Sequence, residues 1–128
     1  MNQTLRVLIV DDEASQRAGL AGMVKAWGMV AETASDGLEA LEKLSQMPID
    51  VVLTDLNMPG LSGVELQSRL LADGYRMPII FITAFSEETA RARAMKAGAI
   101  CFMSKPYRED RLIDCLDRAL KAPDPGAA

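Results

Sequence analysis

Three aspartates stand directly after short apolar runs. Asp11 and Asp12 follow residues 5–10, and Asp55 follows residues 49–54. Carboxylates that lie close together repel one another, and a bound divalent cation is the simplest remedy. All-oxygen ligands favour a hard ion, Mg²⁺ or Mn²⁺, which keeps several waters and leaves room for a phosphate oxygen. The three aspartates therefore predict a cation site that also receives an anion, with Asp55 at its centre.

Two further polar residues stand at the ends of apolar runs in the second half of the chain. Thr83 ends residues 78–83, and Lys105 follows shortly after residues 99–103. A hydroxyl donor and a fixed positive charge beside a cation could hold two more oxygens of a phosphoryl group. The sequence contains no histidine, which removes imidazole catalysis and the commonest zinc ligand.

The elements that must position these residues alternate along the chain. Short apolar runs predict strands at residues 5–10, 29–33, 49–54, 78–83 and 99–103. Between these runs, apolar residues recur at helical spacing behind capping signals. Helices are expected at residues 14–27, from Asp36 with Leu38, Leu41 and Leu44 on the buried side, from Ser62 to Gly74, from Ser86 to near Gly98, and at residues 107–121.

Five alternations of strand and helix, with nearly continuous apolar strands, predict a parallel sheet covered by helices on both faces. We therefore expect a flavodoxin-like, doubly wound (βα)5 fold of the α/β class with strand order 2-1-3-4-5. In this order the chain reverses its direction across the sheet between the first and third strands, where ligands bind. Asp11, Asp12 and Asp55 follow those two strands, so the fold would bring them into one crevice.

The bulk properties fit one compact domain. The 128 residues are 49% hydrophobic, and we expect a domain at residues 1–121 and a tail or linker at residues 122–128. A net charge of −4 gives no basic footprint for nucleic acid, and the apolar run at residues 5–10 is far too short to span a membrane. We expect a soluble, cytoplasmic protein.

Two cysteines, Cys101 and Cys115, fit neither a metal-ligand spacing nor a disulfide-rich pattern. They fall in a predicted strand and a predicted helix. We therefore expect both to be reduced residues that pack in the core.

Several short motifs stand at the strand ends in one order. They are Asp11-Asp12, Asp55 within Leu-Thr-Asp-Leu-Asn-Met-Pro-Gly-Leu-Ser-Gly, Thr83-Ala84, Phe102, and Lys105-Pro106. In this order and spacing the chain resembles the receiver domain of bacterial two-component response regulators, over residues 5–121. The stretch Met-Pro-Gly-Leu-Ser-Gly-Val-Glu-Leu also resembles the regulators that carry a C-terminal helix-turn-helix.

The resemblance implies a signalling phosphoacceptor rather than an enzyme. Asp55 would take a phosphoryl group from the phosphohistidine of a sensor histidine kinase or phosphotransfer protein. Asp12 would bind Mg²⁺ directly, Asp11 largely through water, and the backbone carbonyl of Asn57 would complete the protein's share. Lys105 and the metal would neutralise the charge on the transferred oxygens.

The resemblance also implies a switch. Thr83 would move to donate to a phosphoryl oxygen, and Phe102 would turn inward into the space that this vacates. Ala84 would leave room for the phosphate by being small, and Lys105-Pro106 would be a cis peptide that aims the ammonium into the site. The fourth helix, fifth strand and fifth helix would form the output surface for an effector domain, an effector protein or a second copy of the chain.

Other functions remain open from the residues alone. A phosphatase of the haloacid dehalogenase type also uses a strand-end aspartate with magnesium, although such enzymes want a second aspartate where Asn57 stands. A flavin or other nucleotide carrier would want a glycine-rich or polar loop after the first strand, whereas this loop is acidic. A receiver that binds partners without phosphorylation would be expected to lack a site residue. Taken singly, the acids at residues 11–13 could be helix N-terminal residues, and Asp55 a turn residue.

Overall fold

Strands and helices alternate along the chain as predicted. The computed structural model describes residues 5–84 and 88–121, so the expected cap at Ser86 and the tail at 122–128 lie outside the described residues. The strands are β1 (Arg6–Val10), β2 (Val30–Ala34), β3 (Val51–Thr54), β4 (Ile79–Thr83) and β5 (Cys101–Ser104). The helices are α1 (Ala14–Ala26), α2 (Gly37–Gln46), α3 (Gly63–Ala72), α4 (Glu88–Lys96) and α5 (Glu109–Lys121).

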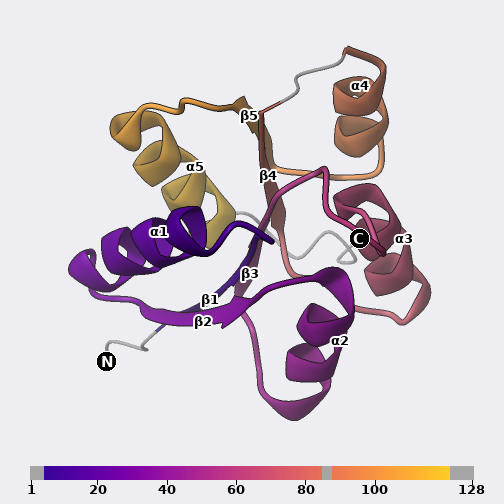
Figure 1. Cartoon of the computed structure of the whole chain (residues 1–128), viewed down its shortest axis with the longest axis horizontal. Coiled ribbons are helices and arrows are strands. Elements are labelled where there is room, and N and C mark those ends of the chain that lie inside the picture. Colours follow the sequence, from indigo (N-terminus) through magenta and orange to yellow (C-terminus); the bar gives the residue numbers. More distant parts are fainter. Residues whose placement is uncertain (1–4, 85–87, 122–128) are drawn as a thin grey trace.

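The strands form one parallel sheet in the expected order β2-β1-β3-β4-β5. Strand β1 pairs with both β2 and β3, and Val10 at its end lies opposite Thr54 at the end of β3. Helices α1 and α5 cover one face of the sheet, and α2, α3 and α4 cover the other (Figure 1). The carboxyl ends of β1 and β3 therefore lie side by side, which confirms the predicted doubly wound fold.

The side chains of each strand alternate between two hydrophobic cores. Leu8 and Phe81 point into the core that α2, α3 and α4 cover. Val7 and Ile80 point into the core that α1 and α5 cover, and all four side chains are fully buried. Burial on both faces explains why the strands read as continuous apolar runs in the sequence.

Local capping sets where α2 and α3 begin. Ser62 and Glu65 form a complete capping box at the start of α3. At α2 the Asp36 carboxylate accepts a hydrogen bond from the N–H of Glu39. The Glu39 carboxylate accepts from the N–H of Ser35. Both predicted helix starts are therefore confirmed, with a one-residue variation of the box at α2.

The predicted inward position of Leu38 is wrong. Leu44 on α2 and Leu112 and Leu116 on α5 are buried as expected, but Leu38 is 66% exposed. Leu44 and Ala40, four residues apart, define the buried face of α2. Leu38 lies two residues before Ala40, about 200° around the helix axis, and therefore faces outward.

Helix α4 is held by little apolar surface. Ala94 is the only described residue of α4 that is buried. The side-chain amide of Gln67, a buried residue on α3, donates to the carbonyl of Ala94 at 3.1 Å. A helix with few apolar contacts and one polar link can shift at a small cost in free energy, and α4 has these properties.

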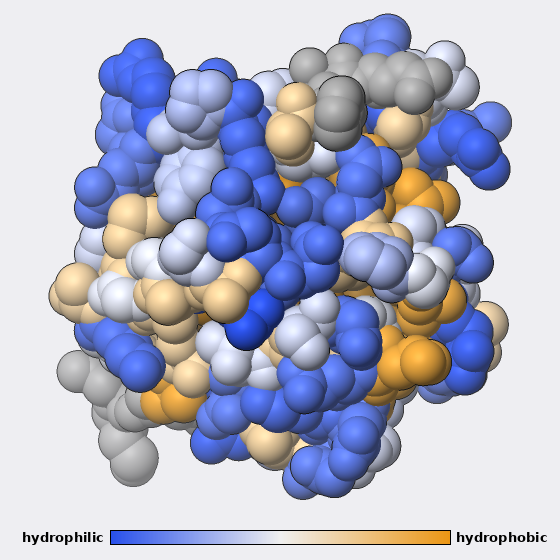
Figure 2. All heavy atoms as spheres, in the orientation of Figure 1, coloured by the Kyte–Doolittle hydropathy of each residue, from blue (hydrophilic) through white to orange (hydrophobic). Residues whose placement is uncertain are grey.

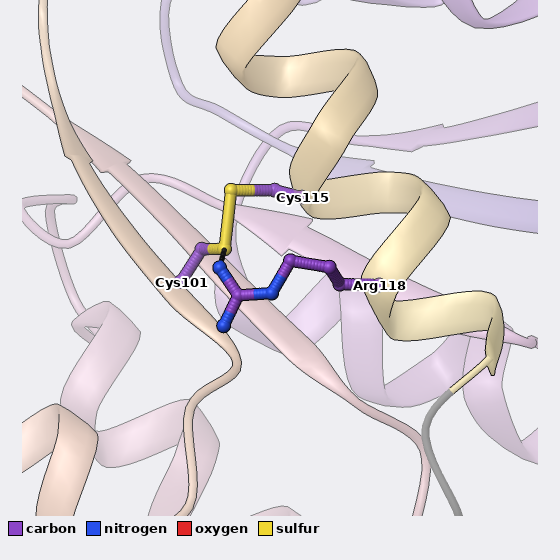
Figure 3. Close-up of a disulfide and its surroundings, with 3 residues drawn as sticks. All are labelled: Cys101, Cys115 and Arg118. Carbon is purple, nitrogen blue, oxygen red and sulfur yellow. Dashed lines mark hydrogen bonds between the residues drawn. A yellow bond between two sulfur atoms is a disulfide. The ribbon is translucent and has the colours of Figure 1, made fainter.

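The prediction that both cysteines are reduced is wrong. Cys101 on β5 and Cys115 on α5 form a disulfide, and their Cα atoms are 6.2 Å apart (Figure 3). Both residues belong to the core that α1 and α5 cover. No sequence pattern indicates this pair, because bridging geometry depends on how α5 packs across β5.

The surface is mostly polar in the view of Figure 2, where hydrophobic residues appear in separate spots among hydrophilic ones. Within the described residues, none of the helices combines the length and the apolar character that crossing a membrane requires.

Gly63, at the start of α3, packs closely against the loop that follows β3. A Cβ at this position would meet the backbone carbonyl of Asp55 and would lie 2.9 Å from the Cα of Leu56. Because both neighbours are backbone atoms, we expect Gly63→Ala to lower the free energy of unfolding by about 2–3 kcal/mol. Urea denaturation followed by circular dichroism measures this change.

Gly22→Ala is the matched control. Gly22 lies on the exposed side of α1, and a Cβ there meets nothing within 4 Å. Alanine favours the helix, so this variant should raise the free energy of unfolding by about 0.5–1 kcal/mol. Two substitutions with the same effect would contradict the close approach of α3 to the Asp55 loop.

Candidate functional site

The carboxyl end of the sheet gathers the predicted site residues. The N–H of Asp55 donates to the carbonyl of Val10 at 2.9 Å, and the N–H of Lys105 donates to the carbonyl of Thr83 at 2.7 Å. The N–H of Asp11 donates in the same way to the last residue of β2, at 3.1 Å. These bonds extend the strand ladders by one residue, so the sheet register fixes where each side chain leaves the sheet.

The carboxylates of Asp11, Asp12 and Asp55 converge as predicted, with one oxygen of each lying within 4.8 Å of the others. Asp11 is 2% exposed and Asp55 8% exposed, whereas Asp12 is exposed. Local N–H groups orient the two buried carboxylates. Asp11 accepts from the N–H of Glu13 at 2.9 Å, and Asp55 Oδ1 accepts from the N–H of Asn57 at 3.0 Å.

Lys105 lies between the two buried carboxylates. Its Nζ is 2.8 Å from Asp55 Oδ2 and 3.3 Å from Asp11 Oδ2. Burial by itself disfavours the ammonium, but the hydrogen bonds and charges of Asp55 and Asp11 outweigh burial and raise the pKa of Lys105. The expected cis peptide between Lys105 and Pro106 is confirmed.

The hydroxyl of Thr83 is joined to a residue that sequence reasoning had not placed beside it. The side-chain amide Nδ2 of Asn57 donates to Thr83 Oγ1 at 3.2 Å, and Thr83 is fully buried. The role predicted for Asn57 involves its backbone carbonyl alone, and that role stays a prediction. The predicted strand order was the available signal, because Asn57 follows β3 and Thr83 ends the neighbouring β4.

Phe102 is already turned inward. It is 9% exposed, and the centroid of its ring lies 6.0 Å from that of Phe81 in the core that α2, α3 and α4 cover. The inward position therefore does not require a phosphoryl group. The predicted coupling between Phe102 and Thr83 stays a prediction.

Glu13 and Ala84 lie next to the cluster but outside the group of converging carboxylates. The Glu13 carboxylate caps α1 by accepting from the N–H of Gln16 at 2.8 Å. This bond and further bonds from Ser15 hold the pKa of Glu13 below its usual value. The helix-capping interpretation of the acidic run thus applies to Glu13, whereas its two neighbours join the cluster. Ala84 is exposed and lines a groove with Lys105 and other residues next to the site.

The donor set fits a hard divalent cation. Three carboxylates offer oxygen atoms on one side of the crevice, and the chain has no histidine to favour a softer ion. Asp12 is exposed, so water can complete the coordination of an ion held there, as Mg²⁺ prefers. The acidic cluster can therefore hold a metal ion.

Comparison with known proteins places this arrangement in a family. The model of the response regulator receiver domain matches residues 7–117. The chain belongs to this family. A receiver domain is the phosphoacceptor of two-component signalling, and the fold and the acidic cluster described above agree with that role. The alternative of a haloacid dehalogenase-type phosphatase is not supported.

Individual relatives agree with this assignment. The transcriptional regulatory protein FixJ of Bradyrhizobium diazoefficiens is 31% identical over 121 residues, which cover 94% of this chain and 59% of FixJ. The sensor histidine kinase RcsC of Salmonella typhi is 35% identical over 115 residues, 90% of this chain and 12% of RcsC. The crystal structure of FixJ-N has a TM-score of 0.87 and 34% identity, and the match covers 95% of this chain and 98% of that one. The receiver thus matches one portion of each of these two longer relatives.

Removal of Lys105 should reveal the repulsion between Asp11 and Asp55. Lys105→Met leaves two buried carboxylates without their counter-charge, so the free energy of unfolding in metal-free buffer should fall by about 2–4 kcal/mol. Added Mg²⁺ should restore part of this loss, because the ion would supply the missing positive charge. Urea unfolding with and without Mg²⁺ measures both effects.

Lys121→Met is the control for Lys105→Met. The Nζ of Lys121 lies 3.0 Å from Asp117 Oδ2, but both side chains are more than half exposed, so we expect a change of at most about 0.5 kcal/mol. The contribution of Lys105 should be complete below its ordinary pKa, about 10.4, and should be lost as the pH rises through its raised folded value. Equal losses in the two variants at neutral pH would contradict the burial of the Lys105 pair.

Proposed function

We propose that Asp55 accepts a phosphoryl group from the phosphohistidine of a sensor histidine kinase or phosphotransfer protein, in a Mg²⁺-dependent reaction. The convergence of three carboxylates with Lys105 and Thr83 at one end of the sheet carries this proposal. Asp55 is the central member, because β3 lies between β1, which delivers Asp11, and β4, which ends at Thr83.

The surroundings of Asp55 suit a nucleophile that must hold one orientation. The N–H of Asn57 binds Oδ1, and the Nζ of Lys105 binds Oδ2. In the transfer, a carboxylate oxygen of Asp55 forms a bond to phosphorus, the P–N bond to the donor imidazole breaks, and the imidazole nitrogen keeps the electron pair. Lys105 is positioned to stabilise the charge on the transferred oxygens.

Asp11, Asp12 and Asp55 would hold the cation, with the backbone carbonyl of Asn57 as the further protein ligand. When bound, Mg²⁺ supplies charge neutralisation to the phosphoryl oxygens. Lys105 contacts Asp11 at 3.3 Å, a longer distance than its 2.8 Å to Asp55. The ammonium can therefore turn from Asp11 toward a phosphoryl oxygen and still hold Asp55.

The phosphorylated site would act on the surface formed by α4, β5 and α5. The hydroxyl of Thr83, which accepts from Asn57, would move to donate to a phosphoryl oxygen, and Phe102 on the adjacent strand would respond. Helix α4 would shift most readily, because Ala94 is its only described buried residue. The domain would signal through this surface rather than act as an enzyme.

The relatives indicate the kinds of partner that this surface would meet. FixJ is a transcriptional regulatory protein, and RcsC is a sensor histidine kinase, so related receivers occur in both contexts. We infer a kinase or phosphotransfer partner, an effector domain or effector protein on α4, β5 and α5, and a homodimer through the same surface. Because a partner of this kind would act in the cytoplasm, we propose that the domain works there.

Phosphoryl transfer can be tested without the natural kinase. Incubation with acetyl phosphate and Mg²⁺ should give one labile phosphoryl adduct per chain, because Asp55 is the carboxylate that both Asn57 and Lys105 hold. Asp55→Asn should give none. Intact-protein mass spectrometry, with and without a chelator, measures the adduct.

Asp114→Asn controls for the loss of an aspartate, since Asp114 is an exposed residue of α5 and should label like the wild type. An adduct that persists in Asp55→Asn, or that forms equally in a chelator, would contradict the proposed site. Turnover of a generic phosphate ester would contradict the assignment as a non-enzymatic phosphoacceptor.

Phosphorylation alone should switch the surface only in part. Moving a two-state equilibrium from 1% to 99% requires about 5.5 kcal/mol of differential binding. One new hydrogen bond from Thr83 supplies about 1 kcal/mol, or up to about 3 kcal/mol when charge-assisted. Fluorine NMR of a fluorinated Phe102 should therefore show a partial change with phosphate, which a bound partner or second copy completes.

Thr83→Val separates the contribution of the hydroxyl. The variant keeps the shape of the side chain, so it should still take the phosphoryl group and should give a smaller change at Phe102. A single, fully shifted signal in the phosphorylated wild type without any partner would show that this energetic estimate is wrong.

A further inference from the structure

The disulfide between Cys101 and Cys115 lies apart from the phosphoacceptor site. It joins the first residue of β5 to α5, on the face of the sheet that α1 and α5 cover. Ser104, which pairs with Thr83 at the site, is three residues further along β5, or roughly 10 Å away. The bond therefore has no part in the proposed transfer to Asp55.

A guanidinium stands beside one of the two sulfur atoms. Arg118 lies on α5 three residues after Cys115, and its Nη1 is 3.8 Å from Sγ of Cys101 (Figure 3). Both cysteines are buried, whereas Arg118 is exposed at the surface. A positive charge thus stands where a Cys101 thiolate would form if the bond were broken.

We propose that this disulfide is a reversible redox site that exchanges with dithiols, with Arg118 stabilising Cys101 as the leaving thiolate. In the first step, a thiolate of the dithiol attacks Sγ of Cys115, a mixed disulfide forms, and Cys101 leaves with the electron pair of the broken bond. In the second step, the other thiolate of the dithiol attacks the dithiol sulfur that is bonded to Cys115. The dithiol closes into a disulfide, and Cys115 leaves as a thiolate. The dithiol loses two electrons, and its two protons end on the two cysteines.

The position of Arg118 determines which sulfur is the better target. A thiolate that is stabilised by a neighbouring cation leaves faster, so attack on Cys115 with departure of Cys101 is the favoured direction. Burial of both cysteines means that α5 must open locally before a reagent reaches Cys115. Exchange should therefore be slower than at an exposed disulfide.

A reversible disulfide also suits the cytoplasm. This part of the inference rests on the proposed function, which gives the domain a cytoplasmic location. Disulfides in that compartment are rare, and those that occur are usually transient and redox-sensing. In the oxidised form, the covalent link between Cys101 and Cys115 holds α5 against β5. Reduction removes this link from one half of the surface proposed to signal.

The rate of reduction tests the role of Arg118. The full chain is first equilibrated with oxidised glutathione, then treated with excess dithiothreitol, and free thiols are trapped with iodoacetamide and counted by mass spectrometry. The wild type should start with both cysteines protected. Arg118→Gln should be reduced roughly three- to tenfold more slowly, because the leaving thiolate has lost its counter-charge.

Two further variants separate charge from packing. Arg118→Lys keeps the charge and should be reduced within about twofold of the wild-type rate. Arg111→Gln removes the same charge from an exposed position seven residues earlier, on nearly the same side of α5, and should also stay within about twofold. If Arg118 had a purely structural role, Arg118→Gln should be reduced faster than the wild type, because a loosened α5 would expose the disulfide.

The proposal is overturned if the cysteines alkylate freely after oxidised glutathione, or if Arg118→Gln is reduced as fast as the wild type or faster. It is also overturned if Arg118→Lys is as slow as Arg118→Gln. None of these measurements involves phosphorylation, so their outcome is independent of whether Asp55 takes a phosphoryl group. Acetyl phosphate should label the oxidised and reduced chains to the same extent.

Discussion

Buried negative charge at the carboxyl end of the sheet is the constraint on which this structure depends. Asp11 and Asp55 are almost completely removed from water, and each keeps a local N–H donor. Donors orient a carboxylate but do not cancel the repulsion between two of them. Lys105 supplies the opposing charge from a position 50 residues after Asp55. The ends of β1, β3 and β5 must therefore hold their places together, and any cation or anion that enters the crevice acts on the same balance.

Asn57 connects the Asp55 carboxylate to Thr83, the residue proposed to switch. Its backbone N–H holds the Asp55 carboxylate, and its side-chain amide holds the hydroxyl of Thr83 on the neighbouring strand. The backbone carbonyl of Thr83 in turn accepts a hydrogen bond from the N–H of Lys105. Asp55, Asn57, Thr83 and Lys105 are thus joined in a ring of contacts. A change of charge on Asp55 would act on this ring, which includes Thr83, the residue expected to move. The geometry favours a concerted response over the independent rotation of one threonine.

Features that depend on hydrophobic periodicity and strand order could be predicted from the sequence. Features that depend on how side chains pack between elements could not. The strands, the order 2-1-3-4-5 and the meeting of Asp11, Asp12 and Asp55 all follow from apolar runs and from carboxylates at their ends. The disulfide escaped prediction because it depends on the angle at which α5 crosses β5. Leu38 was misplaced because Ala40 and Leu44 define the buried face of α2, and Leu38 lies on the other side of the helix. Asn57 was undervalued because its partner, Thr83, lies 26 residues away.

The two helices of the proposed output surface are attached to the sheet in different ways. Helix α5 buries Leu112, Leu116 and Cys115, and the disulfide adds a covalent link. Helix α4 depends on Ala94 and on one amide from α3. Strand β5 stands between them, and its consecutive residues Cys101 and Phe102 point into opposite cores. A rearrangement around Phe102 therefore meets a movable α4 on one side and a fixed α5 on the other. Under the proposed function, a partner would read the relative motion of the two helices rather than the displacement of either alone. The redox state of the disulfide would set how firmly α5 is held.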